Sequence, residues 1–346
     1  MTNPDPLADL GWTADFLRQL DLDDIGTTHP IRVSTVHRSR VEAMGADGAV
    51  ALWLPSAMSS ADIAVGDWLL TRDGVILRRL DRRSLLSRKA AGSHLAEQLI
   101  AANLDTLFVV TSCNNDFNEG RLERFLVLAA QAEVTPVLIL TKSDLSRDPQ
   151  SYIDRAQHLS RGLVVLALDA RQESARETLA DWCGPGRTIA LLGSSGVGKS
   201  TLANALTGTG QDTGGIREDD AKGRHTTTSR NMLPMIGGGW LIDTPGMREL
   251  QLTDVGDGIE AFFDDIATLA RNCRFSDCKH DGEPGCAIRA AIDAGDLDEA
   301  RLHRWEKLKR EDRFNTEALH LAHSRNKTFG KLHRKSGAKR NPGKRR

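Results

Sequence analysis

Long apolar runs are absent from this 346-residue sequence. No stretch approaches the roughly 20 consecutive apolar residues that a membrane-spanning helix needs. The first residues, MTNPDPLADLGW, lack the basic head and apolar run of a secretory signal. No internal repeat is found, which excludes a repeat array. The sequence therefore predicts a protein with two or three domains, no membrane association and a cytoplasmic location.

Acidic residues are absent from the end of the chain. After Glu317 there is no Asp or Glu, but there are ten Lys and Arg residues. Subtracting these ten from 46 basic residues leaves 36 against 47 acidic ones, a net charge of −11 before the tail. An acidic body with a basic tail favours a polyanionic partner such as RNA over a merely solubilising tail, because Gly, Ser and Asn interrupt the basic residues.

Cysteine is sparse and unevenly placed. Two of the five cysteines, Cys113 and Cys183, are isolated and are predicted to be small core residues. The other three surround one histidine within fourteen residues: Cys273, Cys278, His280 and Cys286. In a cytosolic protein such a cluster indicates a metal rather than disulfides, and a Cys₃His set suits one structural Zn²⁺ ion.

The pattern along the chain changes three times. An acidic, irregular start predicts a flexible arm, and the short alternating runs that follow predict a small β-barrel, with an OB-fold preferred over a β-sandwich. Buried-type strands then alternate with helical stretches, which predicts a mostly parallel α/β sheet. These strands are expected at 106–110, 136–140, 163–168, 188–192 and 240–243. The last part is helical apart from the cysteine cluster. The predicted parts are 1–29 (arm), 30–87 (barrel), 88–255 (α/β domain), 256–320 (helical zinc domain) and 321–346 (basic tail).

The strongest motif is GSSGVGKS, which matches the P-loop pattern between a strand and a helix. Its glycines let backbone N–H groups surround phosphate oxygens, and the helix start favours the anion. Lys199 is expected to reach the β- and γ-phosphates, and Ser200 to ligate Mg²⁺. The expected nucleotide contacts are Gly193, Ser194, Ser195, Gly196, Val197, Gly198, Lys199, Ser200 and Thr201.

A second motif, Thr141-Lys142-Ser143-Asp144, follows the expected strand 136–140. The Asp144 carboxylate can accept from both the N1–H and the 2-amino group of guanine. Adenine has no such pair of donors, so the motif predicts GTP rather than ATP. Motifs of this kind usually begin with Asn, so Thr141 lacks the side-chain amide that Asn would supply. The alternative is a solvated loop at the end of a strand.

Two further motifs complete the expected site. Asp243-Thr244-Pro245-Gly246 resembles a magnesium and γ-phosphate motif, with Asp243 near Mg²⁺ and the Gly246 N–H near the phosphate. GRHTTT, at 223–228, is expected to close on Mg²⁺ through Thr227. A Thr triplet taken alone would be an ordinary polar loop.

The order of the motifs is permuted, because the guanine motif precedes the P-loop by about 50 residues. Loops at the carboxyl ends of neighbouring parallel strands can still form one site. With this order, the leading β-barrel and the cysteine cluster, the chain over about residues 30–310 resembles the ribosome small-subunit-dependent GTPase A family. The resemblance implies an OB-fold, a circularly permuted GTPase domain, a zinc domain, and binding to the 30S subunit and its 16S rRNA.

The resemblance also implies a catalytic role for His225, alongside Lys199 and Thr227. One departure is Ala167–Ala170, where GTPases usually carry a Ser-Ala pair whose backbone contacts the base. Asp169 replaces the Ser, so this contact must rest on the Ala170 backbone or nearby groups. We expect a monomer that hydrolyses GTP to GDP. The alternatives are another P-loop enzyme, such as a small-molecule kinase or ATPase, and a non-catalytic RNA-binding scaffold.

Overall fold

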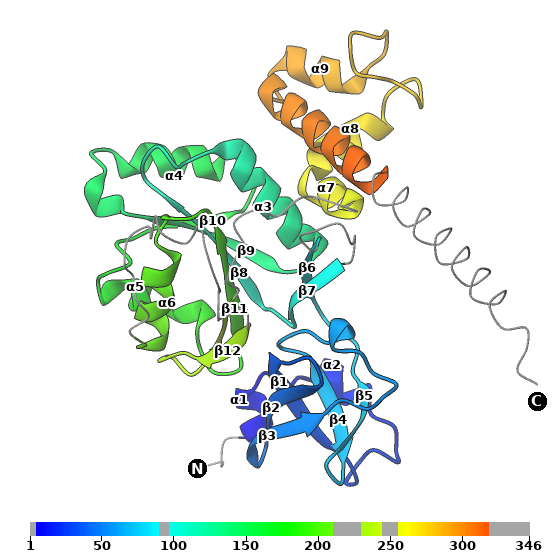
Figure 1. Ribbon diagram of the computed structural model, residues 1–346. Helices are drawn as coiled ribbons and strands as arrows, with labels where there is room; N and C mark the ends of the chain where they lie inside the picture. The colour runs from blue at the N-terminus through cyan, green and yellow to red at the C-terminus, as the bar shows by residue number, and fades with distance from the viewer. Residues whose placement is uncertain (1–4, 90–96, 210–229, 244–254, 318–346) are drawn as a thin grey trace, which may run out of the picture. The chain divides into compact units, whose positions relative to one another are not determined.

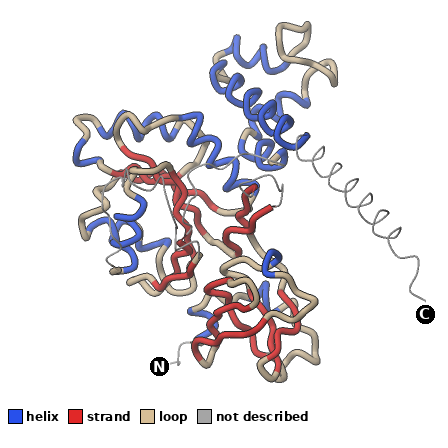
Figure 2. The backbone as a smooth tube through the Cα atoms, in the orientation of Figure 1, coloured by secondary structure: helices blue, strands red, loops and turns tan. Residues whose placement is uncertain are grey.

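The computed structural model describes residues 5–89, 97–209, 230–243 and 255–317. The chain divides into two compact units, Met1–Ser87 with Leu99–Leu250, and Arg88–Gln98 with Gln251–Arg346. Nearly all strands belong to the first unit, whereas residues 255–317 contain helices and loops only (Figures 1 and 2). None of the described helices is long and apolar enough to cross a membrane.

Five short antiparallel strands follow one another early in the first unit (Figure 1). They are β1 (His29–Val36), β2 (Arg40–Gly45), β3 (Gly48–Trp53), β4 (Trp68–Arg72) and β5 (Val75–Arg79), with the 3-10 helix η1 (Ser60–Asp62) before β4. Their order is β3-β2-β1-β4-β5, and the end strands β3 and β5 contact each other. The inward residues of these strands are apolar and form a separate small core, as the alternating sequence predicts.

A mostly parallel sheet forms the rest of the first unit. Its strands are β8 (Thr106–Ser112), β9 (Thr135–Thr141), β10 (Val164–Ala167), β11 (Thr188–Gly193) and β13 (Trp240–Asp243). They are parallel in the order β10-β9-β8-β11-β13, and β12 (Asn231–Pro234) joins β13 antiparallel. All residues of β8 and β11 are buried, which explains their continuous apolar sequences. The predicted α/β class is confirmed.

Helices lie on both faces of this sheet (Figure 1). They are α3 (Glu119–Gln131), α4 (Pro149–Gln157), α5 (Ser174–Thr178) and α6 (Lys199–Thr207), with the 3-10 helices η2 (Ser143–Leu145) and η3 (Ala180–Trp182). A two-stranded sheet of β6 (Leu85–Lys89) and β7 (Glu97–Ala102) precedes β8. Cys113 and Cys183 are both buried, which confirms them as core residues. Burial raises the pKa of Cys113 to about 11.

The start of the chain packs against strands β4 and β5, so the expectation of a flexible arm is wrong for residues 5–28. Two short helices, α1 (Pro6–Asp9) and α2 (Ala14–Leu17), carry apolar side chains into a common core. Phe16 has no exposed surface, and Trp12 meets Trp68 edge to face with 4.9 Å between ring centroids. A few large apolar residues therefore outweigh the acidic composition that suggested mobility.

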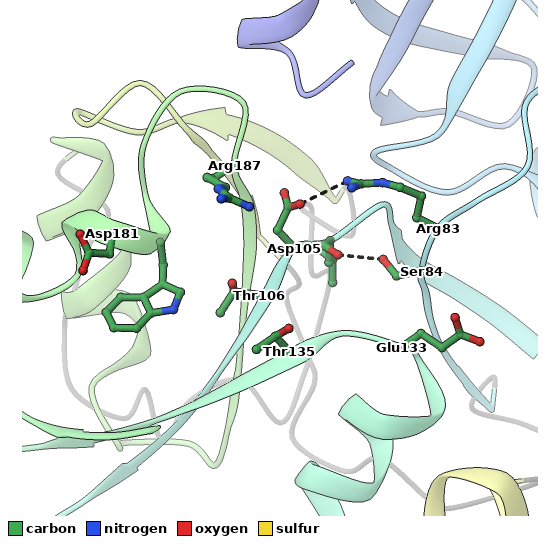
Figure 3. Close-up of a pocket in the computed structure, with 10 residues that line it drawn as sticks. Arg83, Ser84, Asp105, Thr106, Glu133, Thr135, Asp181 and Arg187 are labelled. Carbon is green, nitrogen blue, oxygen red and sulfur yellow. Dashed lines mark hydrogen bonds and ion pairs between the residues drawn. The ribbon is translucent and has the colours of Figure 1, made fainter. Parts of the chain in front are cut away.

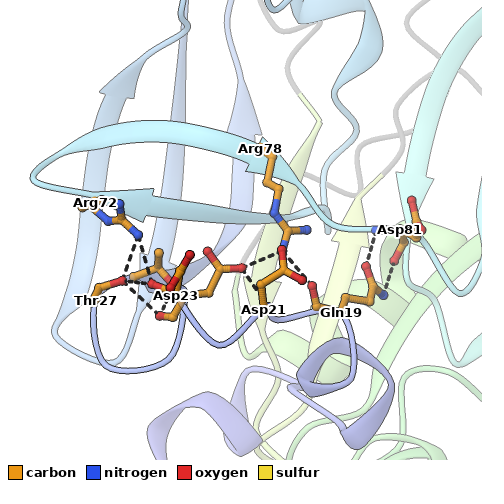
Figure 4. A network of polar contacts seen from close by, with 9 residues as sticks. Gln19, Asp21, Asp23, Thr27, Arg72, Arg78 and Asp81 are labelled. Atoms are coloured by element: carbon orange, nitrogen blue, oxygen red, sulfur yellow. Dashed lines mark hydrogen bonds and ion pairs between the residues drawn. The ribbon is translucent and has the colours of Figure 1, made fainter.

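Acidic residues of this segment are also paired with arginines of β4 and β5 (Figure 4). Arg78 donates to Asp24 Oδ2 at 2.8 Å and to the carbonyl of Gln19 at 2.7 Å. The Gln19 side chain exchanges two hydrogen bonds with the Asp81 backbone, at 2.6 and 3.2 Å. The Arg78 hydrogen bond lowers the pKa of Asp24. The acidic loop is thus held by specific contacts.

A buried arginine joins the parts of the first unit. Arg32 of β1 is 1% exposed and donates to the carbonyls of Leu10 at 2.5 Å and Asn103 at 3.0 Å. Burial lowers the pKa of Arg32 to about 10. Because an unpaired buried donor is costly, these carbonyls fix the N-terminal segment and the start of the α/β sheet to β1.

The described part of the second unit after residue 254 is helical. It contains α7 (Gly256–Phe262), α8 (Asp264–Arg271), α9 (Ala287–Ala294) and a further helix through 299–317. Leu302, Trp305 and Leu308 of that last helix are buried. Their three-residue spacing therefore marks the buried face of this helix.

Candidate nucleotide site and metal centre

The P-loop connects the end of β11 to the start of α6. A Cβ atom at Gly193 would lie 2.1 Å from the carbonyl oxygen of Val110 on neighbouring β8, so only glycine fits there. Gly198 precedes α6 with φ +97°, in the left-handed region that favours glycine. The two glycines allow the chain to turn tightly from strand to helix, which leaves the loop backbone open to a phosphate.

Lys199 is the first residue of α6, and its ammonium group turns back over the loop. It donates to the carbonyls of Gly193 at 2.7 Å and Ser194 at 2.5 Å. Ser200, the next residue, is exposed. A helix N-terminus, an ammonium group and an exposed hydroxyl at the end of a buried strand form a site suited to a phosphate and its cation.

The predicted guanine motif is hydrogen-bonded directly to the P-loop. Thr141, which ends β9 and is 1% exposed, has its hydroxyl 2.5 Å from the carbonyl of Val197 and 3.1 Å from that of Thr111. Lys142 adopts a left-handed conformation, φ +55°, and donates to the carbonyl of Gly196 at 2.8 Å. The two motifs, which were predicted separately, thus contact each other, and the Thr141 hydroxyl links the two loops.

Asp144 lies in η2 with 26% of its side chain exposed. Its Oδ2 accepts a hydrogen bond from Arg171 at 2.7 Å, and Arg171 also donates to Asp169 Oδ1 at 3.0 Å. The hydrogen bonds from Arg171 lower the pKa of Asp169. Asp169 was predicted as a departure from the usual pattern, whereas Arg171 was not predicted. An arginine two residues after an unexpected aspartate was the available signal.

Asp243 is the last residue of β13, next to β11 and therefore beside the strand that carries the P-loop. The residues that complete this motif, 244–246 with Gly246, lie outside the described residues. The same holds for 223–228, which include His225 and Thr227. The structure thus places the P-loop, the guanine motif and Asp243 at the carboxyl ends of neighbouring parallel strands.

A cavity of about 430 Å³ lies at the other end of the strands (Figure 3). Its lining includes Thr106 and Thr135, the first residues of β8 and β9. Arg83 bridges to Asp105 at its rim, 3.2 Å apart. Because the P-loop leaves the carboxyl end of the parallel strands, this cavity is distinct from the candidate nucleotide site.

The predicted metal ligands converge in the second unit. The donor atoms of Cys273, Cys278, His280 and Cys286 all lie within 4.8 Å of one another. His280 Nδ1 is 3.6 Å from the sulfurs of Cys273 and Cys286, which are 4.0 Å apart. Two thiolates bound tetrahedrally at about 2.3 Å would be about 3.8 Å apart, so the cluster fits a metal ion the size of zinc.

The surrounding residues keep His280 in place. Its backbone is left-handed, φ +63°, and its carbonyl accepts from Arg289 Nε at 2.8 Å. The Trp305 ring lies 5.9 Å from the imidazole, centroid to centroid. Burial lowers the pKa of His280, which favours the neutral imidazole that a metal requires. The cluster can therefore hold a metal ion.

The fold and the linked loops define a P-loop protein with permuted motif order, and comparison with known proteins agrees. Residues 79–253 match the profile of the RsgA GTPase family. The small ribosomal subunit biogenesis GTPase RsgA of Mesorhizobium japonicum is 51% identical over 316 residues, 90% of this chain and 91% of that protein. A relative of the same description, RsgA 2 of Vibrio parahaemolyticus, is 48% identical over 96% of this chain and 93% of its own length.

Solved structures show the same architecture. YjeQ from Thermotoga maritima superposes with a TM-score of 0.62 at 25% identity, over 82% of this chain and 98% of that one. YloQ, described as a circularly permuted GTPase, shares the fold with a TM-score of 0.60. The chain belongs to the RsgA GTPase family. It is accordingly an enzyme that hydrolyses GTP.

Proposed function

We propose that this GTPase acts in the late maturation of the small ribosomal subunit. It binds the 30S subunit and its 16S rRNA in the GTP state, hydrolyses GTP under stimulation by the subunit, and is released with GDP. The observation that carries the proposal is 51% identity, over nine-tenths of both chains, to a relative named for small-subunit biogenesis. We propose that it acts in the cytoplasm, as a monomer.

In the proposed reaction, water attacks the γ-phosphorus of GTP, and GDP and phosphate leave. Lys199 exchanges its contacts with Gly193 and Ser194 for the β- and γ-phosphates, where its charge offsets the developing negative charge. The backbone of 193–201 surrounds the phosphates. Residues 141–144 hold the base, with the Asp144 carboxylate accepting from the guanine N1–H and 2-amino group.

Magnesium, when bound, neutralises charge on the β- and γ-phosphates. Ser200 and Thr227 would hold the ion, Asp243 would assist them, and the Gly246 N–H would donate to the γ-phosphate. Met247 stands where Ras-like GTPases place the Gln that orients water. We assign that task to His225, whose imidazole can hold a water through either ring nitrogen. The isolated protein should therefore hydrolyse GTP slowly.

The remaining parts are proposed to contact the ribosome. Residues 30–87 form an OB-fold, which is supported by the strand order β3-β2-β1-β4-β5 and the contact of β3 with β5. Residues 88–255 are the permuted GTPase domain, and 256–320 are a domain built around one structural Zn²⁺ ion on the Cys₃His cluster. The tail, 321–346, is proposed to contact rRNA phosphates through its basic residues.

Sedimentation with purified ribosomal subunits tests this function. The protein should pellet with 30S but not 50S subunits in the presence of a non-hydrolysable GTP analogue, and binding should weaken with GDP. A variant that ends at Arg325 should bind 30S more weakly and with a flatter salt dependence, at unchanged intrinsic hydrolysis. Equal binding to both subunits, or none, would overturn the proposal.

A further inference from the structure

Two carboxylates approach one guanidinium group in the loop that follows β10. Arg171 Nη2 lies 2.7 Å from Asp144 Oδ2 and 3.1 Å from Asp169 Oδ2. Arg171 Nε lies 3.0 Å from Asp169 Oδ1. The backbone N–H of Arg171 also donates to Asp169 Oδ1 at 3.0 Å, so Asp169 fixes both the backbone and the side chain of Arg171.

The chemistry of this triplet explains why the arginine is needed. An ionised Asp169 can accept hydrogen bonds but cannot donate one, so it cannot hold the Asp144 carboxylate directly. Two nearby carboxylates without a cation disfavour each other's charged form. A base-reading carboxylate must be ionised to accept from two donors of guanine. Arg171 supplies both the neutralising charge and the hydrogen-bond donor.

We propose that Arg171 is a positioning residue for guanine recognition, anchored by Asp169 and holding the Asp144 carboxylate oriented toward the base. The inference rests on the proposed assignment of Asp144 to guanine reading. It adds a residue outside the two nucleotide motifs to the set that determines base specificity.

The electrostatics and exposure of the group agree with such a role. Hydrogen bonding and charge from Asp169, and then the charge of Asp144, raise the pKa of Arg171. The side chain of Arg171 is 64% exposed, whereas those of Asp169 and Asp144 are 12% and 26% exposed. An exposed ion pair contributes little to folding stability, so removing Arg171 should affect ligand binding rather than the fold.

Titration of nucleotide-free protein with GDP and with inosine diphosphate, which lacks the 2-amino group, tests the proposal. Arg171→Ala should weaken GDP binding on the order of fivefold, as expected for loss of a partly exposed charge pair. The loss for inosine diphosphate should be smaller, since only one donor remains to be read. Arg176→Ala is the matched control, because Arg176 pairs with Glu173 instead, and it should bind both nucleotides normally.

A rescue distinguishes positioning from a general structural effect. Adding Asp169→Ser to Arg171→Ala removes the second carboxylate and introduces a hydroxyl that can donate to Asp144, so GDP affinity should return to within roughly twofold of wild type. Unchanged GDP affinity in Arg171→Ala, equal losses for the two nucleotides, or no rescue would each overturn the inference. Asp144→Asn is measured in parallel. If it leaves GDP binding unchanged, the base-reading assignment itself fails. If it weakens GDP binding and Arg171→Ala does not, only the role of Arg171 fails.

Discussion

Phe16→Ala tests whether the start of the chain is part of the folded first unit. Phe16 has no exposed surface and lies 5.5 Å from Trp12 and 5.8 Å from Trp68, between ring centroids. Truncating a buried Phe to Ala costs about 3–5 kcal/mol of unfolding free energy. The helix that carries it has only four residues, so the site can partly collapse. We therefore expect a loss near the lower end, about 3 kcal/mol.

Urea unfolding followed by tryptophan emission measures this loss, because Trp12 and Trp68 flank the mutated position. Leu17→Ala is the matched control. It is the next residue of the same helix but 56% exposed, and should cost under about 0.5 kcal/mol. If Phe16→Ala is no more destabilising than Leu17→Ala, the N-terminal segment is not part of the cooperative fold and the packing argument fails.

Three further predictions concern the proposed sites. Asp144→Asn should weaken GTP binding and gain binding of xanthosine nucleotides, since an amide can donate to the 2-oxo group; unchanged GTP affinity by titration would refute guanine reading by this residue. Cys278→Ala should release zinc and unfold the helical module while nucleotide binding persists, because metal binding supplies folding energy, and full zinc occupancy by elemental analysis would remove Cys278 from the ligand set. His225→Ala should keep GTP and 30S binding but lose most subunit-stimulated turnover, and wild-type-like stimulation would move the catalytic role to another group.

The nucleotide loops and the metal cluster were predictable because their chemistry is local in sequence. GSSGVGKS needs only a preceding strand and a following helix, and β11 and α6 supply both. Cys273 and Cys286 lie thirteen residues apart, so a short loop can bring their sulfurs within 4.0 Å. The strand sequences were equally clear, because strands buried on both faces are continuously apolar.

Features that depend on distant partners were not predictable in the same way. The burial of Phe16 depends on Trp68, fifty-two residues away in the chain, and the surrounding acidic residues obscured the apolar signal. Arg171 lies twenty-seven residues from Asp144, and only the β9-β10 neighbourhood brings them together. Each contact is tertiary, so a local pattern carries no direct sign of it.

The sheet order explains how a permuted chain forms one site and how that site is joined to strands β1–β5. β8 lies between β9 and β11, and β11 lies beside β13. The guanine motif, the P-loop and Asp243 therefore lie near one another whatever their order in the chain. From β13 the strand pairing continues through β12 to β1. Asn231 of β12 pairs with Asp243 on one side and with Thr35 of β1 on the other, where the two side chains are 3.1 Å apart. Asn231 therefore connects the strand that ends at Asp243 directly to β1, because both strands pair at the same residue.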